Sequence, residues 1–186
     1  MVNRLFSENL SEIDLIGNQY NIFQEAIREY YSEYSPRFSL HFTGYTKTEI
    51  AQQMNDQLHE LDLLFSLKAL AATEGILRRD YIARATEKRR DPVSREFRLL
   101  YKNVNKRASL EEEILPIWRN HGGMSNDLVS QLKGAMKYRH WLAHGRYWTP
   151  KLGRLYDFFT IFQITKNVTY AVIHESIKNN SQSIIG

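Results

Sequence analysis

The sequence predicts an all-α protein, and three observations lead to that prediction. Apolar residues recur at intervals of three and four over most of the 186 residues, which is the periodicity of one helix face. Capping-box pairs stand where several of these stretches begin. Four prolines and nine glycines are too few for the frequent turns of a β-sandwich or barrel. We expect a bundle of about five to seven helices.

The first predicted helix covers about residues 8–34. Ser11 and Asp14 have the spacing of a capping box near its start, and Pro36 ends it. Residues 37–45 follow with a short alternation of apolar and polar side chains. That alternation is too brief to distinguish a strand from an extended loop, so both remain open.

One long helix is predicted for residues 46–90. Thr46 and Glu49 form its capping box, and Pro92 forces a stop because the residue before a proline disfavours helical geometry. A further helical piece covers residues 93–104.

Three more helices complete the prediction. Ser109 begins one of them, with Glu112 as its capping-box partner. The next covers residues 125–144, and either Ser125 or Asn126 caps its start. Gly145 occupies the position just past the helix end where glycine is favoured. The last covers about residues 156–178.

The chain divides into two predicted parts. Residues 1–44 are acidic and rich in tyrosine, and we expect them to form an N-terminal helical segment that is an appendage or a dimerisation arm. Residues 45–186 are expected to form the main helical domain.

Composition excludes several classes of function. The chain contains no cysteine, which excludes disulfide scaffolds, zinc ribbons, iron–sulfur clusters and thiol nucleophiles. No stretch approaches the roughly 18 apolar residues of a membrane-spanning helix, and the first residues lack the apolar core of a signal peptide. The spacing of the histidines and acids matches no common metal site. We expect a cytoplasmic protein with no membrane association, no metal and no cofactor.

Positive charge is concentrated in two segments. Residues 76–107 hold 11 Lys and Arg against 4 Asp and Glu, and residues 133–154 hold 6 against none, although the net charge is only +4. The first segment contains local acid–base pairs, so a solvated helix face is an alternative there. The second has no acidic neighbours. Because local positive charge attracts polyanions, we expect a nucleic acid as partner.

The densest group of reactive side chains is KYRHWLAHGRYWTPK, residues 137–151. It places Arg139, His140 and His144 at the end of a predicted helix. On an unbroken helix, Arg139 and His144 would diverge by roughly 140°. A helix stop at Gly145 allows the His144 imidazole to turn toward the side of Arg139. The alternative is that these cations only satisfy the last carbonyl groups of the helix.

The segment from Arg139 to His144 resembles the signature of HEPN domains, the higher eukaryote and prokaryote nucleotide-binding family. That signature is an arginine, a polar residue after it, and a histidine after four to six residues. The run RHWLAHGRYW is similar to bacterial members, and the resemblance extends over roughly residues 46–178. It implies a HEPN-type helical bundle that dimerises face to face, so that two motifs meet in a cleft that cuts RNA without a metal. Many such proteins are toxins or defence effectors, and others only bind.

The chemistry of these residues agrees with that implication. Cleaving RNA without a metal requires a base for the 2′-hydroxyl, an acid for the leaving 5′-oxygen, and positive charge beside the phosphate. We assign proton transfer to His144, phosphate stabilisation to Arg139, and orientation of the phosphate or ribose to His140. One motif supplies a single His144, so base and acid would come from two protomers.

Basic and aromatic side chains around the motif are predicted to bind RNA. Cations can contact the flanking phosphates, and aromatic rings can stack on unpaired bases. The predicted RNA-binding residues are Lys137, Arg146, Tyr147, Trp148 and Lys151.

Two residues of the long helix are predicted to lie behind the motif. Glu74 has apolar neighbours, where a buried acid needs a partner such as an arginine. It is either a structural ion pair or a support for the motif. Arg78 either lines the cleft or lies on a solvated face.

The resemblance also implies protein partners. Family members that a partner nucleotidyltransferase neutralises carry the modified tyrosine two positions after the motif histidine. This chain has Arg146 there, and Tyr147 comes one position later. An antitoxin or nucleotidyltransferase partner that modifies Tyr147 is therefore an expectation that departs from the family pattern.

Three hypotheses of function follow. The first is a metal-independent endoribonuclease that acts as a homodimer with a composite Arg/His site, as a toxin or antiphage effector. The alternative is a catalytically inactive HEPN-type module that binds RNA or a nucleotide and regulates. The third is a structural helical protein whose aromatic N-terminal segment docks another protein.

Overall fold

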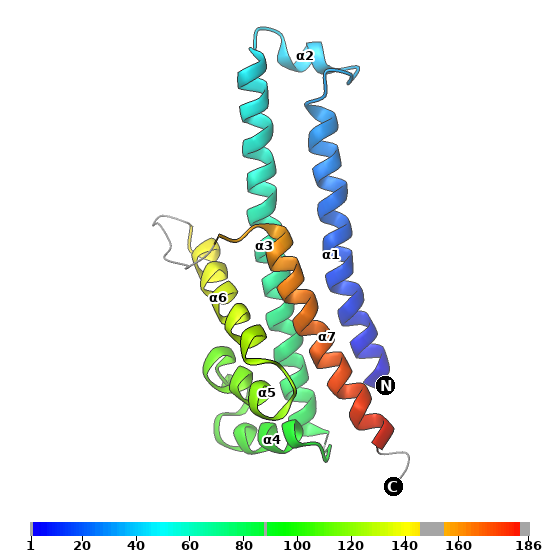
Figure 1. Ribbon diagram of the computed structural model, residues 1–186, viewed down its shortest axis with the longest axis vertical. Coiled ribbons are helices and arrows are strands. Elements are labelled where there is room, and N and C mark those ends of the chain that lie inside the picture. The colour runs from blue at the N-terminus through cyan, green and yellow to red at the C-terminus, as the bar shows by residue number, and fades with distance from the viewer. Residues whose placement is uncertain (1, 88, 146–154, 183–186) are drawn as a thin grey trace.

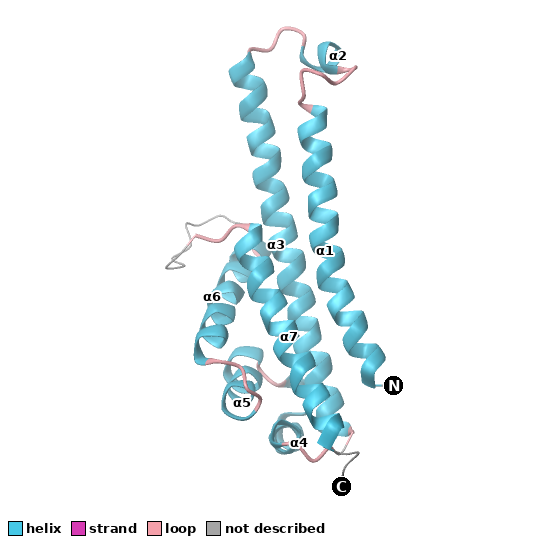
Figure 2. Ribbon diagram, turned by 45° about the vertical axis from the view of Figure 1, so that its right-hand side comes forward, coloured by secondary structure: helices cyan, strands magenta, loops and turns pink. Residues whose placement is uncertain are grey.

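A computed structural model confirms the all-α fold. It describes residues 2–87, 89–145 and 155–182, with side chains described within 12–87, 89–145 and 155–177. Every regular element in these ranges is helical (Figure 2). The elements are α1 (Val2–Tyr30), α2 (Phe38–Phe42), α3 (Lys47–Thr86), α4 (Pro92–Val104), the 3-10 turn η1 (Asn105–Arg107), the π-helical turn η2 (Leu110–Ile114), α5 (Leu115–His121), α6 (Asn126–Ala143) and α7 (Phe158–Gln182). None of them combines the length and apolar character that crossing a bilayer requires.

The long helix α3 is the spine of the bundle. Its predicted capping box is present: the Thr46 hydroxyl accepts a hydrogen bond from the Glu49 amide, and the Glu49 carboxylate accepts one from the Thr46 amide at 2.8 Å. α1, α4, α6 and α7 all pack against α3 (Figure 1). The helix ends at Thr86, slightly before the predicted stop, and Pro92 is the first residue of α4.

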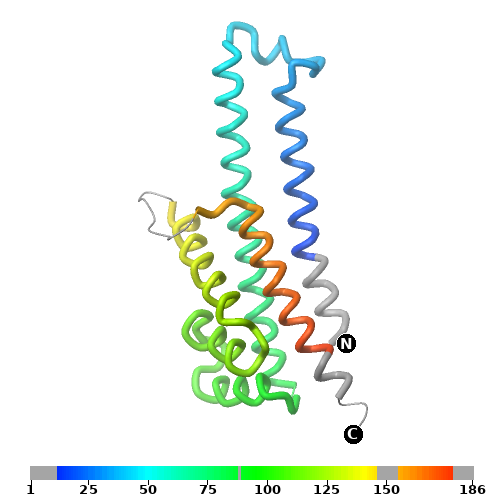
Figure 3. The backbone as a smooth tube through the Cα atoms, viewed as in Figure 1, coloured from blue at the N-terminus to red at the C-terminus, as the bar shows by residue number. Residues whose placement is uncertain are grey.

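The upper parts of α1 and α3 extend beyond the other helices (Figures 1 and 3). At the base of this extension the Tyr20 ring stacks on Phe158, the first residue of α7, with ring centres 4.0 Å apart. The Phe65 ring lies edge-on to the Phe158 ring, with ring centres 5.9 Å apart. We call α1 after Tyr20 together with α3 before Phe65 the two-helix arm; α2 lies at its tip.

The N-terminal segment shares the core of the main bundle. Ile13 and Ile16 of α1 are buried. Gly17 permits close contact with α7, because a Cβ atom there would lie 2.8 Å from the ring of Phe162. The lower half of α1 is therefore packed on the bundle, and the boundary at residue 44 stays a prediction.

The prediction of a strand or extended loop for residues 37–45 is wrong, because α2 occupies Phe38–Phe42. A lone extended segment would leave its backbone groups without partners, whereas a helical turn satisfies them locally. Aromatic packing holds this turn: the Phe42 ring is buried, with its centre 5.2 Å from that of Tyr31 and 5.6 Å from that of Tyr30. The predicted start of the first helix is also wrong, since α1 begins at Val2.

The helical stretch after α4 begins at Ser109 as predicted, but its reciprocal partner differs. The Ser109 hydroxyl accepts from the Glu112 amide at 3.3 Å, while the Ser109 amide donates to the Glu113 carboxylate at 2.6 Å. The π-helical turn η2 contains one residue more than an α-turn. That extra residue moves the capping carboxylate from Glu112 to Glu113.

A buried charge cluster joins α3, α4 and α7. The Arg84 guanidinium is buried and lies 2.9 Å from Asp80 and 3.1 Å from Asp91, and it donates to the Ser176 hydroxyl at 2.7 Å. It also lies 4.9 Å from the ring centre of Trp118. Burial raises the pKa of Asp80 to about 6, although the Arg84 charge opposes this rise. The Arg84 guanidinium at 2.9 Å favours the ionised form of Asp80.

We expect Arg84→Ala to lower the free energy of unfolding by about 3–5 kcal/mol, because two buried carboxylates lose their countercharge. Urea unfolding followed by circular dichroism measures the change. The matched control is Arg79→Ala, whose exposed ion pair with Glu12 contributes about 1 kcal/mol or less. Equal losses for the two variants would contradict a structural role for the cluster.

Candidate functional site

α6 carries the Arg/His motif, and its ends are formed by the predicted residues. At the start the Ser125 hydroxyl accepts from the Leu128 amide at 3.1 Å. At the end His144 is the cap residue, and its amide donates to the His140 carbonyl at 3.1 Å. Gly145 follows with a φ of 81°, in the left-handed region that favours glycine. The motif therefore lies at an ordered helix terminus.

Arg139 is held by a carboxylate of α3. Its Nη2 atom lies 3.1 Å from Glu74 Oε2, and Arg78 Nε donates to the other oxygen, Oε1, at 2.9 Å. Arg78 Nη1 also donates to the carbonyl of Ala108 at 3.0 Å. Glu74 is thus the shared acceptor of two guanidinium groups and joins α3 to α6. The arginine partner expected for Glu74 is present, and Arg78 belongs to the same cluster.

This cluster retains positive charge. Two guanidinium groups face one carboxylate, and the side chains of Arg139 and Arg78 are 34% and 40% exposed. Within the described residues, Nε of Arg139 is buried without a hydrogen-bond partner. An unpaired buried donor costs about 1–3 kcal/mol. Arg139 is therefore held by Glu74 on one side only. The two guanidinium groups and the one carboxylate together leave a net charge of +1 that can attract an anion.

His140 and His144 form a pair at the same end of α6. Their ring centres are 4.2 Å apart and the rings are tilted by 51°. Both side chains are exposed. Their separation of four positions places both on one helix face, and imidazole can donate or accept a proton near neutral pH. One protomer thus presents two adjacent groups suited to proton transfer.

The structure groups the predicted site residues in two sets: Arg139 with Glu74 and Arg78, and His140 with His144. Lys137 lies exposed on α6. The remaining predicted RNA-binding residues lie outside the described part of the chain; they are Arg146, Tyr147, Trp148 and Lys151.

An aromatic stack that the sequence analysis missed supports the end of α6. The Tyr138 ring stacks on Trp141 and on Tyr156, with ring centres 5.7 and 5.2 Å apart. A Cβ atom at Gly134 would lie 2.5 Å from the Tyr156 hydroxyl, so a larger residue there would displace the Tyr156 side chain. The available signal was a glycine inside a helix, which indicates a close approach by another group. The stack ties the chain on both sides of residues 146–154.

No known protein family, characterised protein or solved structure matched the chain in comparisons of its sequence and fold. Among the described residues, no group of three or more His, Asp or Glu side chains is arranged to hold a metal ion.

We expect Glu74→Ala to lower the free energy of unfolding by about 1–3 kcal/mol, because Arg78 and Arg139 lose their common acceptor. Glu74→Gln retains an acceptor oxygen and should cost less. Urea unfolding gives both values. Glu112→Ala is the control: its side chain is 77% exposed, and the change should stay within about 0.5 kcal/mol. A loss no larger than that of the control would exclude Glu74 as the link between α3 and α6.

Proposed function

We propose that this protein is a metal-independent endoribonuclease of the HEPN type that acts as a homodimer with a composite Arg/His site. Its proposed biological role is that of a toxin or an antiphage effector. One observation carries the proposal: at the exposed end of α6, the imidazoles of His140 and His144 lie 4.2 Å apart, and the preceding Arg139 is held by Glu74.

The proposed reaction transfers the phosphodiester within the RNA. A neutral imidazole accepts the proton of the 2′-hydroxyl, and the 2′-oxygen then forms a bond to phosphorus. The bond from phosphorus to the 5′-oxygen breaks, and a protonated imidazole supplies the proton to that oxygen. The proposed proton-transfer groups are the His144 imidazoles of the two protomers, one neutral and one protonated. His140 orients the phosphate or the ribose.

Arg139 is proposed to stabilise the negative charge that develops on the phosphate oxygens. Its fork of donors suits a phosphate, and a donor that is already oriented needs little rearrangement during the reaction. The Glu74 carboxylate supports this role by holding the guanidinium at 3.1 Å. Lys137, Arg146 and Lys151 are proposed to bind the flanking phosphates, and Tyr147 and Trp148 to stack on unpaired bases.

A second candidate is a catalytically inactive module that binds RNA or a nucleotide and regulates. The same ion pair favours it, since Glu74 offsets part of the positive charge of Arg139 and Arg78. Phosphate binding requires only the remaining charge, whereas cleavage also requires proton transfer. For either function, an antitoxin or a nucleotidyltransferase acting on Tyr147 is a proposed partner, and the cytoplasm is the proposed location.

We expect the purified protein to cleave single-stranded RNA in the presence of a chelator, because the proposed site uses no metal. His144→Ala should lower the rate by about 10²–10⁴, the usual contribution of acid–base catalysis. Arg139→Ala should also abolish cleavage without unfolding the protein. Gel analysis of labelled RNA measures the rates, and circular dichroism verifies the fold.

His174→Ala serves as the matched control, because His174 is an exposed histidine of α7. It should leave cleavage unchanged. Full activity of the His144→Ala variant would exclude the assigned proton transfer. RNA binding that weakens steeply with salt, without any cleavage by the unmodified protein, would instead establish the binding module.

A further inference from the structure

The structure separates the cations of the basic segment 76–107 into two groups. Those of α3 are engaged within the chain, since Arg78, Arg79 and Arg84 each lie within 3.1 Å of a carboxylate oxygen. A second group belongs to α4 and η1, is exposed, and has no ion-pair partner among the described residues. It consists of Arg95, Lys102, Lys106 and Arg107.

These cations cover the outward face of α4 and continue into η1. The buried side of α4 consists of Val93, Ser94 and Phe97. On the opposite side, Arg95 and Lys102 are seven positions, or about 10.5 Å, apart. Five basic residues stand against one acidic residue, Glu96, over positions 92–107. Glu96 is rotated by about 100° from Arg95 around the helix, so it lies beside the basic face and not within it.

Clustered cations destabilise a helix unless an anion covers them. Arg95 and Arg98 are three positions apart, and Arg98 and Lys102 are four apart. At these spacings like charges repel each other across one helix turn. The helix dipole favours a cation in the last turn, which accounts for Lys102 but not for the two arginines before it. The pattern therefore indicates a polyanionic ligand.

The η1 turn is fixed on α3 from both sides. The Tyr81 hydroxyl donates to the carbonyl of Asn105 at 2.7 Å, and Arg78 Nη1 donates to the carbonyl of Ala108 at 3.0 Å. The two cations of η1 lie in sequence between these two hydrogen bonds. Their backbone is therefore already oriented, and little order is lost when they bind an anion.

Arg78 connects this surface with the Arg/His motif. Its Nε atom donates to Glu74, the carboxylate that also holds Arg139. Arg78 and Glu74 are one turn, or about 6 Å, apart along α3. The η1 turn thus lies beside the arginine cluster that retains positive charge.

The glutamates of η2 limit the surface where the chain continues. Glu112 lies 3.6 Å from Lys133, and Glu113 accepts from the Ser109 amide at 2.6 Å. Glu111 is half-buried. Because Lys133 belongs to this internal pairing, the surface ends at η1 and does not include it.

We propose that the outward face of α4 together with η1 binds the phosphate backbone of RNA, at a site separate from the motif. Its cations suit phosphates and carry no base-reading pattern, so the binding is independent of sequence. A membrane surface is less suitable, because the apolar side of α4 is buried and Leu99 is its one exposed large apolar side chain. That the bound RNA is a substrate rests on the proposed function, whereas the binding surface does not.

Fluorescence anisotropy with a labelled single-stranded RNA tests the surface. The RNA is about 20 nucleotides long, more than the roughly 4–16 nucleotides that one single-strand-binding fold covers. All proteins carry His144→Ala, so that the RNA stays intact. The test variant combines Arg95→Gln, Lys102→Gln, Lys106→Gln and Arg107→Gln.

We expect the test variant to raise Kd about tenfold at low salt, because it removes four exposed charge contacts. The slope of log Kd against log salt concentration should become smaller by about 2–3, since each phosphate contact with a single strand contributes about 0.7. An unchanged slope would overturn the proposal.

The matched control removes the same number of charges from exposed positions of α1, α3 and the arm tip. It combines Arg28→Gln, Arg37→Gln, Lys47→Gln and Lys68→Gln. Its Kd should stay within about twofold of the unmodified value, because charges beyond the Debye length of about 8–10 Å are largely screened. Circular dichroism verifies the fold of both variants. Equal weakening in the two would overturn the surface, as would binding to anionic phospholipid vesicles without any binding to RNA.

Cleavage separates this proposal from the proposed nuclease. With His144 restored, the four substitutions on α4 and η1 should raise KM for the same RNA about tenfold and leave kcat unchanged, because they remove binding and touch no reacting atom. A protein that cleaves no RNA, but binds it through α4 and η1, would retain the surface and exclude the nuclease.

Discussion

The position of the motif depends on one carboxylate shared by two arginines. Glu74 receives Arg78 from its own helix and Arg139 from α6, so it fixes α6 against α3 at the level of the motif. Helix packing alone tolerates some sliding and rotation, and the ion pair at 3.1 Å limits both at the level of the motif. The side chain is 22% exposed, which keeps the interaction partly shielded from water while one positive charge stays accessible. The same contact thus locates the guanidinium and leaves it able to meet an anion.

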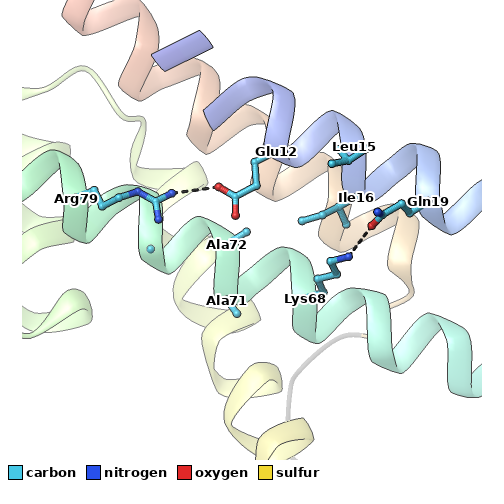
Figure 4. A pocket seen from close by; sticks show the side chains of 9 residues that line it. Glu12, Leu15, Ile16, Gln19, Lys68, Ala71, Ala72 and Arg79 are labelled. Atoms are coloured by element: carbon cyan, nitrogen blue, oxygen red, sulfur yellow. Dashed lines mark hydrogen bonds and ion pairs between the residues drawn. The ribbon is translucent and has the colours of Figure 1, made fainter. Parts of the chain in front are cut away.

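The different faces of α3 make different contacts. One face is buried and ends in the Arg84 cluster, which binds α3 to α4 and α7. The Glu74 and Arg78 face meets α6, and Ala71 and Gly75 line a groove between α3 and α1 (Figure 4). α3 therefore carries both the buried charge cluster of the core and the carboxylate that holds Arg139.

Local chemistry made part of this structure predictable. A cap or a left-handed glycine depends on residues within about four positions, so the Thr46 capping box and the Gly145 helix end follow from the sequence. The sequence predicted that Glu74 has an arginine partner. It could not identify Arg139 as that partner, because the two residues are 65 positions apart and residue spacing predicts only local contacts. Arg84 shows the same limit, since its Ser176 partner lies 92 positions away. Residues 37–45 form a helical turn because Tyr30 and Tyr31 pack on Phe42, a tertiary contact that outweighs a weak local pattern.

The exposure of the histidine pair explains why one chain is an incomplete catalyst under the proposed mechanism. His140 and His144 face water, where a charge interaction at 4 Å contributes about 1 kcal/mol, far less than in a dry site. Transition-state stabilisation by preorganised charges requires that water be excluded. The second protomer of the proposed homodimer would supply that exclusion as well as a second set of imidazoles. Assembly and catalysis would then be linked, because the protomer that encloses the exposed end of α6 would also bring the second His144.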